Sequence, residues 1–259
     1  MFIPQFSQGV SAASSRLAIL GGAGGIGRAL TTAAAAQGVD VIVLDLEASL
    51  ARHPVIHGVY AYAVDATDEQ SVEQAFAAIG QRWDGLDGFV NLCGFMHPYE
   101  MADAIPISTF DEIVTGNLRS VAIGGQAAMP LLRRGEGASL VHAASGLAQF
   151  IRPGRAAYAA AKAGVIALTK TLALENAPHV RANAIAPSAV DTAFLRGGTG
   201  RSDEDGPSNL DIDAYAKAIP MQRIAEVDDI VGPILFLLSD ASRYMTGQVL
   251  WINGGAYMP

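Results

Sequence analysis

A short apolar run, a cluster of glycines, an alanine-rich stretch and a β-branched run follow one another between residues 16 and 44. The glycines stand where the first apolar run ends and the alanine-rich, helix-forming stretch begins. Glycine at such a junction allows a tight turn and lets a ligand approach the backbone closely. This order predicts a βαβ unit of about thirty residues, with a helix between two parallel strands.

The alternation of apolar and helix-forming stretches continues to the C-terminus. Strands separated throughout by helices favour a parallel sheet that is covered by helices on both faces. With 259 residues, of which 51% are hydrophobic, the chain can bury one large core, and no repeat or linker divides it. The expected fold is therefore an α/β, doubly wound parallel sheet in a single domain. Strands are expected at 17–20, 39–44, 59–64, 86–92, 139–143, 180–185 and 249–252, and later helices at about 68–82, 110–133, 155–176 and 228–238.

The glycine cluster also predicts a dinucleotide site, and its residues fit two patterns. Gly22, Gly24 and Gly27 satisfy G-x-G-x-x-G, whereas Gly21, Gly25 and Gly27 satisfy G-x-x-x-G-x-G. Both patterns let a pyrophosphate approach the backbone and face the N-terminus of the helix. A tight turn that binds no ligand is the alternative.

Asp45 stands at the end of the second strand. A carboxylate at this place accepts hydrogen bonds from the adenosine ribose hydroxyls and repels an added 2′-phosphate. Arg28 is the only nearby cation that favours the phosphorylated cofactor, so NAD is the expected cofactor; an ordinary surface aspartate is the alternative. At the end of the next strand, Asp65 or the adjacent backbone at Ala66 is expected to meet the adenine.

Tyr158 and Lys162 lie four residues apart in one predicted helix, so they share a face with Cβ atoms roughly 5–6 Å apart. An ammonium group near a phenol favours the phenolate and lowers a pKa that is normally about 10. A phenolate formed near neutral pH is a usable general base. Ser145 precedes this helix, where a loop can bring its hydroxyl beside the phenol. The alternative is a half-buried ring beside a solvated amine.

Composition limits the partners and the location of the chain. A net charge of −8 argues against a nucleic-acid partner, because no basic stripe could neutralise phosphates. Cys93 is the only cysteine, which excludes an intrachain disulfide and fits a reducing cytoplasm. The five histidines form no metal-ligand spacing, so no metal is expected. Residues 1–15 lack the features of a signal peptide and are expected to form a poorly ordered arm, and no stretch reaches the roughly 20 apolar residues that span a bilayer.

Residues 193–214 interrupt the alternation and are rich in Gly, Ser and Asp. A loop of this length in a compact domain is usually a functional lid or a disordered excursion. It follows the carboxyl end of a strand, the edge at which α/β sheets bind ligands. We therefore expect a substrate lid at about 193–214.

From about residue 16 to the C-terminus, the sequence resembles the short-chain dehydrogenase/reductase family. The family's glycine motif T-G-x-x-x-G-x-G is matched at residues 20–27 with Leu20 in place of Thr, and this match selects the second glycine pattern. The family's Y-x-x-x-K falls on Tyr158 and Lys162. Residues 91–94 and 183–192 resemble its N-N-A-G and P-G segments, with departures that include Leu92 and Ser188, and residues 246–255 are typical of its C-terminus.

The resemblance implies a Rossmann-like fold and hydride transfer between NAD(H) and a small secondary alcohol or ketone. It implies that Tyr158 is the general base or acid, that Ser145 donates a hydrogen bond to the substrate oxygen, and that Lys162 holds the phenolate and the nicotinamide ribose. Asn117 is expected to hold a water in a proton relay. Cofactor contacts are expected at Gly21, Gly25, Ile26, Gly27, Asp45, Asp65, Ala66, Asn91, Gly94, Tyr158, Lys162, Pro187, Val190 and Thr192.

The sequence does not decide which alcohol or ketone is the substrate. Phe150 and Phe194 suit an apolar or ring-containing molecule, and Arg152 suits an acidic group or a surface ion pair. The resemblance also implies a cytoplasmic homotetramer. The alternatives are an NADPH-dependent ketoreductase of carrier-bound 3-oxoacyl groups, disfavoured by Asp45, and a non-catalytic dinucleotide sensor. Candidate substrate contacts are His97, Gly146, Gln149, Phe150, Arg152 and Phe194.

Overall fold

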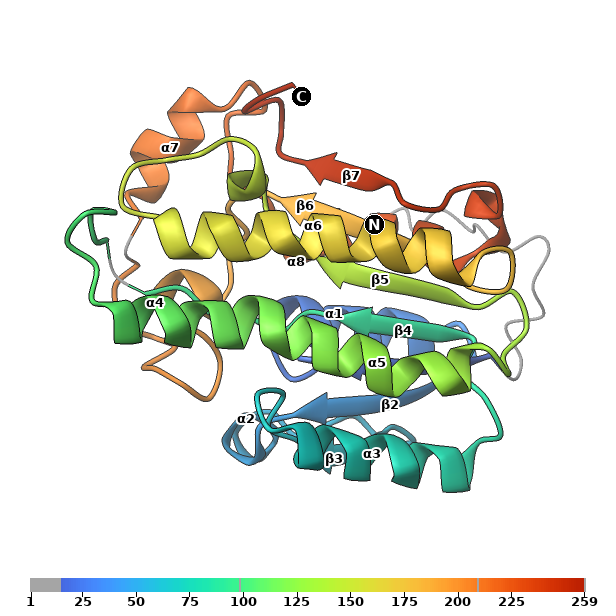
Figure 1. Cartoon of the computed structure of the whole chain (residues 1–259). Helices are drawn as coiled ribbons and strands as arrows, with labels where there is room; N and C mark the ends of the chain where they lie inside the picture. The colour runs from blue at the N-terminus through green and yellow to red at the C-terminus, as the bar shows by residue number, and fades with distance from the viewer. Residues whose placement is uncertain (1–14, 98, 209, 259) are drawn as a thin grey trace.

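Seven parallel strands form one sheet in the order β3-β2-β1-β4-β5-β6-β7 (Figure 1). The computed structural model describes residues 15–97, 99–208 and 210–258, so all but the last residue of the expected N-terminal arm lies outside it. All seven expected strands are present, and the doubly wound parallel sheet in one domain is confirmed. The strands are β1 (Arg16–Leu20), β2 (Asp40–Asp45), β3 (Tyr60–Ala63), β4 (Gly88–Asn91), β5 (Ser139–Ala143), β6 (Arg181–Pro187) and β7 (Val249–Ile252).

Helices cover both faces of this sheet (Figure 1). Successive side chains of a strand point to opposite faces. Accordingly, Ala18 and Leu20 of β1 pack with α3 and α5, whereas Leu17 and Ile19 pack with α1 and α8. The helices are α1 (Gly25–Ala35), α2 (Glu47–Arg52), α3 (Glu69–Arg82), α4 (Ile107–Val114), α5 (Ser120–Leu132), α6 (Ala156–Asn176), α7 (Ile212–Ala218) and α8 (Val227–Leu238), with short helical turns η1 (Thr115–Arg119), η2 (Gly146–Ala148), η3 (Ala193–Arg196) and η4 (Asp240–Ser242).

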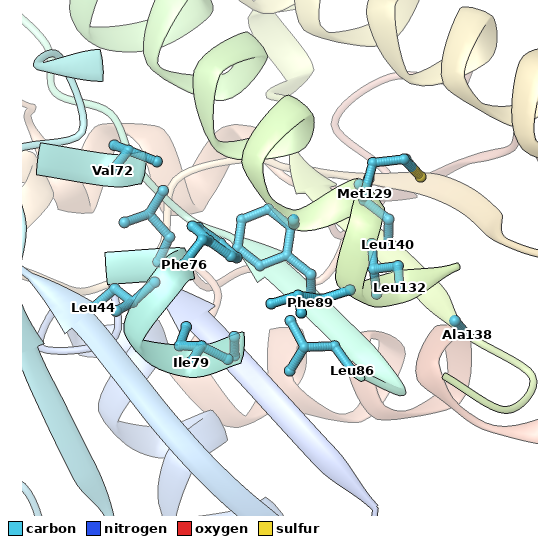
Figure 2. Close-up of a cluster of buried hydrophobic side chains, with 14 of the residues drawn as sticks. Leu44, Val72, Phe76, Ile79, Leu86, Phe89, Met129, Leu132, Ala138 and Leu140 are labelled. Carbon is cyan, nitrogen blue, oxygen red and sulfur yellow. The ribbon is translucent and has the colours of Figure 1, made fainter. Parts of the chain in front are cut away.

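Phe89 of β4 lies at the centre of the core between the sheet and helices α3 and α5 (Figure 2). Its ring meets that of Phe76 edge to face, with centroids 5.4 Å apart and an interplanar angle of 82°. Such pairs add to the stability that burial of the rings provides. This packing fixes β4 against the helices α3 and α5, and with it the loop at the carboxyl end of β4.

Two expected segments differ in detail from the structure. The stretch expected as one helix over 110–133 is two α-helices joined by the wide π-turn η1. The hydroxyl of Ser120, the first residue of α5, donates to the Gly116 carbonyl oxygen of this turn. The expected loop over 193–214 contains η3 and ends in α7, whose first turn is capped by Asp211 through the Ala214 amide. Helix α2 was not expected from the sequence.

Helix α6 is, among the described residues, the helix whose length and mean hydropathy of 1.2 would suffice to cross a bilayer. The expectation that no segment reaches this threshold is therefore wrong by that measure, because the many alanines of α6 count as apolar. In this fold α6 packs against β6 and α4. Core helices of globular domains commonly have the same length and hydropathy.

Candidate active site

Because all pairings are parallel, the strands end at one edge of the sheet, the side to which the arrowheads of β4, β5, β6 and β7 point in Figure 1. A cavity of about 580 Å³ lies at this edge. In parallel α/β sheets this edge is where ligands bind. The glycine turn and Tyr158 line the same cavity. Residues at or just after the strand ends that line it are Leu20, Asp45, Val64, Leu92, Ala143 and Pro187.

The glycine turn between β1 and α1 is packed so tightly that larger residues do not fit. Gly21 has a φ of +82°, which side chains rarely adopt, and a Cβ on Gly27 would collide with the Gly21 carbonyl oxygen. A Cβ on Gly25 would stand 2.7 Å from Cγ2 of Thr192. Gly21, Gly25, Ile26 and Gly27 all line the cavity, so the backbone of the turn is open to a ligand as the sequence predicted.

Asp45 ties the end of β2 to this turn. Its Oδ2 accepts a hydrogen bond from the Ala23 amide at 2.8 Å, and its Oδ1 accepts from the Leu46 amide at 2.8 Å. Burial raises the pKa of this carboxyl, and these hydrogen bonds act in the opposite direction. Arg28 donates to the Ala23 carbonyl oxygen at 2.7 Å. A carboxylate at one end of the cavity and open backbone at the turn are the chemistry that a dinucleotide's ribose and pyrophosphate require, so the residues fit that cofactor.

The remaining cofactor candidates divide into those that line the cavity and one that does not. Asp65, Ala66, Gly94, Pro187, Val190 and Thr192 line it. The Asp65 carboxylate accepts from the amide and hydroxyl of Thr67 at 2.9 and 2.7 Å, which closes the turn after β3. Asn91 is fully buried and does not line the cavity, and its Oδ1 accepts from the Cys93 amide, so its side chain holds the turn after β4.

Tyr158 and Lys162 lie on one turn of α6, and both are buried. The Lys162 Nζ lies 5.7 Å from the centre of the Tyr158 ring and donates to the carbonyl oxygens of Ala143 and Cys93 at 2.9 and 3.4 Å. Burial raises the pKa of the Tyr158 phenol and lowers that of Lys162 to about 8. The expectation that Lys162 lowers the phenol pKa is therefore wrong here, because desolvation outweighs the effect of nearby charge.

The groups that do favour the phenolate are Ser145 and Arg155. The Ser145 hydroxyl hydrogen bonds the phenol and the Arg155 guanidinium attracts its charge, and both oppose the effect of burial on the Tyr158 pKa. Ser145 caps η2 by accepting from the Leu147 amide at 3.2 Å. The loop after β5 thus brings Ser145 to Tyr158, as the sequence predicted.

Asn117 is fully buried in η1 and does not line the cavity. Its Oδ1 accepts from the Phe95 amide at 3.2 Å, and its Nδ2 donates to the carbonyl oxygens of Phe95 and Ile113, each at 2.9 Å. The side chain therefore anchors the loop that follows β4. Its two amide hydrogens are committed to backbone, which leaves the expected water relay without a donor from this side chain.

The substrate end of the cavity is walled by aromatic rings. Phe150 stacks on Tyr257 with centroids 5.1 Å apart, and Phe194 lies 6.0 Å from the Tyr158 ring. Gly146 and Arg152 also line it, and Arg152 lies 4.3 Å above the Phe150 ring.

Two substrate candidates, His97 and Gln149, do not line the cavity. His97 faces Glu112, with Nε2 and Oε2 3.2 Å apart. Gln149 is exposed at the end of η2.

The segment after η3 crosses from the substrate end of the cavity to helix α2. Thr199 lines the cavity, and its carbonyl oxygen accepts from the Ser49 hydroxyl at 3.3 Å. In this segment, which is otherwise rich in Gly and Asp, Glu204 contacts the end of α2. Its Oε2 lies 2.8 Å from His53 Nε2, and its Oε1 lies 3.4 Å from Arg52 Nε. The expected lid is therefore attached to the helix that follows Asp45.

Comparisons with known proteins agree with this architecture. A protein-family model described as Enoyl-(Acyl carrier protein) reductase matches residues 21–257. Levodione reductase of Leifsonia aquatica is 31% identical over 247 residues, which cover 92% of both chains. The 3-oxoacyl-acyl-carrier-protein reductase FabG of Thermotoga maritima is 32% identical, covering 92% of this chain and 95% of that protein. The 3-phenylpropionate-dihydrodiol/cinnamic acid-dihydrodiol dehydrogenase of Photorhabdus laumondii is 32% identical, covering 92% of this chain and 88% of that protein.

Solved structures agree as well. A 3-ketoacyl-(acyl-carrier-protein) reductase from Brucella melitensis complexed with NADH superposes with a TM-score of 0.85 at 27% identity, covering 96% of this chain and 100% of that one. A short-chain glucose/ribitol dehydrogenase from the same organism gives a TM-score of 0.83 at 26% identity, covering 95% and 97%. This chain belongs to the short-chain dehydrogenase/reductase family. It is a hydride-transfer oxidoreductase with a nucleotide-binding Rossmann fold.

Several residues that line the cavity of this short-chain dehydrogenase/reductase were not predicted from the sequence. Arg155 precedes the first residue of α6, and its position three residues before Tyr158 was the available signal. Tyr257 comes from the far C-terminus and had no local signal, because tertiary packing alone brings it to Phe150. The cavity-lining residues not predicted individually include Met96, Arg155, Arg201, Tyr215 and Tyr257.

Proposed function

We propose that this chain is an NAD(H)-dependent dehydrogenase or reductase of a small secondary alcohol or ketone. One observation carries the proposal: Ser145, Tyr158 and Lys162 share a single cavity with the glycine turn and Asp45. An acid–base group and a dinucleotide site in one cavity are the parts that reversible hydride transfer needs.

In oxidation, Tyr158 accepts the proton of the substrate hydroxyl, and in reduction it returns the proton to the carbonyl oxygen. Ser145 donates a hydrogen bond to that oxygen and so stabilises its developing negative charge. Arg155 and the Ser145 hydroxyl both favour the phenolate that acts as the base. The bound nicotinamide accepts or supplies the hydride.

Lys162 and Asn117 position this chemistry. The Lys162 ammonium is held by the carbonyl of Ala143 at the end of β5 and by that of Cys93 just after β4, beside Gly94. From there it is placed to bind ribose hydroxyls of the nicotinamide half. Asn117 fixes the backbone of Phe95 and thereby the loop after β4, which lines the cavity.

The surroundings of Asp45 support NAD over NADP as the cofactor. Arg28 is bonded to the Ala23 carbonyl oxygen, and Arg52 of α2 is paired with Glu204 and Asp205. The charge of Arg52 is therefore already balanced, and the Asp45 carboxylate repels a 2′-phosphate. Arg28 has no carboxylate partner in the described part of the chain, so it is a nearby cation that would favour the phosphorylated cofactor.

The names of relatives support a ring-shaped alcohol or ketone as the substrate. The names of two relatives specify a dihydrodiol and levodione. The aromatic walls formed by Phe150, Tyr257 and Phe194 offer apolar surface to a ring of this kind.

An NADPH-dependent 3-oxoacyl reductase is the second candidate, because FabG of Thermotoga maritima is a relative of equal similarity. The two candidates make different predictions for cofactor choice. We would incubate the purified protein with secondary alcohols, cyclic diols and 3-oxoacyl thioesters, each with both cofactors. Tyr158→Phe is the control.

Turnover of a cyclic alcohol with NAD, lost in Tyr158→Phe, supports the proposal. Preference for NADPH and a 3-oxoacyl thioester supports the second candidate. Binding of a dinucleotide without turnover of any substrate would instead favour a sensor.

We also propose a cytoplasmic homotetramer that pairs α6 between subunits. An exposed stripe of small and apolar residues runs along α6 and includes Ala160, Ala163, Ala167 and Leu174. Small residues let two helices approach closely, and the exposed Leu174 adds apolar surface to the stripe. Light scattering of the purified chain measures the mass, and Ala163→Glu is expected to lower it.

A further inference from the structure

The guanidinium of Arg155 is half-buried at the substrate end of the cavity without a carboxylate partner among the described residues. Its Nη1 donates to the His97 carbonyl oxygen at 2.6 Å, and the groups that act on its charge are the hydroxyls of Tyr158 and Tyr99. A guanidinium carries five N–H donors, so most of its hydrogen-bonding capacity is unused. Burying a cation is unfavourable unless an anion compensates it, and burial indeed lowers the pKa of Arg155.

A second unpaired arginine stands nearby. Arg152 lines the same cavity and lies over the Phe150 ring, without an ion pair in the described part of the chain. The third arginine of the cavity, Arg201, differs because it is paired with Glu112 at 3.2 Å. In a chain of net charge −8, two arginines without acidic partners at one site are a local excess of positive charge.

The cavity therefore offers three kinds of contact at its substrate end. The Tyr158 and Ser145 hydroxyls bind the reacting oxygen, the rings of Phe150 and Phe194 offer apolar surface, and the arginines offer positive charge. Guanidinium groups bind carboxylates with paired, charge-assisted hydrogen bonds.

We propose that this enzyme acts on a cyclic hydroxy acid or keto acid, whose carboxylate binds Arg155 with support from Arg152 while its ring packs on Phe150 and Phe194. The inference rests on the proposed function, because the carboxylate is placed relative to the oxygen that Tyr158 protonates. It adds the substrate class that the proposed function leaves open.

The test compares 3- and 4-oxocyclohexanecarboxylate with their methyl esters, in reduction with NADH or NADPH at pH 7. The acid and the ester differ in charge while the ring and the reacting carbonyl stay the same. We expect kcat/KM for the better acid to exceed that of its ester by about tenfold or more, since a hydrogen bond to a charged group is stronger than one to a neutral group.

The variants separate charge from structure. Arg155→Gln can still donate to the His97 carbonyl but lacks the charge, and Arg155→Lys keeps the charge. Arg155→Gln is expected to lower kcat/KM for the acid by about tenfold to a hundredfold, mainly through KM, and to change the ester much less. Arg155→Lys retains part of the preference, and Arg152→Met reduces it by a smaller factor. Arg134→Met, an exposed arginine before β5 at the opposite edge of the sheet, is the matched control and leaves the preference intact.

The preference for the acid decides the inference. Equal kcat/KM for acid and ester in the wild type, or an equal loss for both in Arg155→Gln, overturns it and leaves Arg155 as a residue that serves Tyr158 or the His97 loop. Failure of the proposed function looks different, because neither ketone is then reduced with either cofactor. In that case, calorimetric binding of cyclohexanecarboxylate to wild type and Arg155→Gln still tests the site; absence of wild-type binding overturns the inference.

Discussion

Gly94 lies so close to Asn117 that a Cβ on residue 94 would stand 2.5 Å from Asn117 Oδ1. The same Cβ would be 3.1 Å from Lys162 Nζ, so both side chains converge on the one residue that leaves room for them. We expect Gly94→Ala to displace them, because its φ of +153° is also unfavourable for alanine. The expected result is a loss of about 1–3 kcal/mol of stability and a fall in kcat/KM of more than about tenfold.

Gly38→Ala is the matched control for this substitution. Gly38 also has a positive φ, of +81°, but nothing lies within 4 Å of a Cβ built on it. Gly38→Ala should also lose stability, because alanine is unfavourable at a positive φ, but it should keep its activity. If Gly94→Ala retained wild-type kcat/KM while melting at a lower temperature, the convergence of Asn117 and Lys162 would not matter for catalysis.

The fold and the centre of the site could be predicted from the sequence because both depend on local patterns. Apolar runs and glycine turns repeat at βαβ spacing, and parallel strands bring their carboxyl ends to one edge. A Tyr and a Lys four residues apart share a helix face whatever the tertiary structure. The positions of Ser145, Tyr158 and Lys162 in one cavity follow from these two facts.

Properties that depend on burial or on distant packing could not be predicted. The pKa of Tyr158 is raised because the ring is desolvated, and spacing along α6 carries no information on this. His97 follows β4, but its side chain turns to Glu112, which comes from α4. Tyr257 reaches the cavity from the C-terminus, and Glu204 reaches α2 from the opposite end of the cavity.

The pH dependence of oxidation should respond to Arg155. Tyr158 must lose its proton to act as a base; burial raises its pKa, and the Arg155 cation opposes that rise. Removing the charge in Arg155→Gln raises the phenol pKa further, so the rise of kcat/KM with pH should move to higher pH. Profiles measured with a neutral alcohol test this. Arg155→Lys should stay near the wild type, and coincident profiles for wild type and Arg155→Gln would show that Arg155 has no influence on the base.

Glu204 should hold the segment that crosses the cavity. Its carboxylate contacts His53 and Arg52 and accepts from the Gly200 amide at 3.2 Å. Glu204→Gln loses the ion pair with Arg52 and the carboxylate that contacts His53, so we expect faster hydrogen exchange over residues 198–206 and faster tryptic cleavage after Arg201. Cofactor should bind several-fold more weakly, because Thr199 of this segment lines the cavity.

Glu47→Gln controls for a loss of charge on α2, where Glu47 is exposed and has no ion pair in the described part of the chain. It should leave exchange and cofactor affinity unchanged. Equal exchange in Glu204→Gln and wild type would mean that the contacts with α2 do not restrain the segment.

Asp45 should decide between the two nicotinamide cofactors. Asp45→Ser removes the carboxylate that repels a 2′-phosphate, so the ratio of NADH to NADPH affinity should fall by about tenfold or more. The Ala23 and Leu46 amides lose their acceptor, and we expect stability to decrease by about 1–2 kcal/mol. Titration of both cofactors by fluorescence measures the ratio. An unchanged ratio would place cofactor selection elsewhere.

The buried His142 should make the fold sensitive to acid. Its Nδ1 pairs with the Thr169 hydroxyl at 2.9 Å, its Nε2 has no hydrogen-bond partner among the described residues, and burial lowers its pKa from 6.5 to about 3. The unfolded chain binds a proton at this histidine below about pH 6.5 while the folded chain does not, so stability falls as pH drops from 6.5 towards 3, by at most about 1.4 kcal/mol per pH unit. His142→Leu removes this term. Because the Thr169 hydroxyl still donates to the Val165 carbonyl oxygen, the stability of His142→Leu at pH 7.5 should stay within about 1 kcal/mol of wild type.

Urea unfolding between pH 7.5 and 4.5 measures this. The free energy of unfolding should decline less steeply with falling pH for His142→Leu than for wild type or for His57→Leu, which alters an exposed histidine. Parallel declines in all three proteins would mean that other groups dominate the loss of stability in acid.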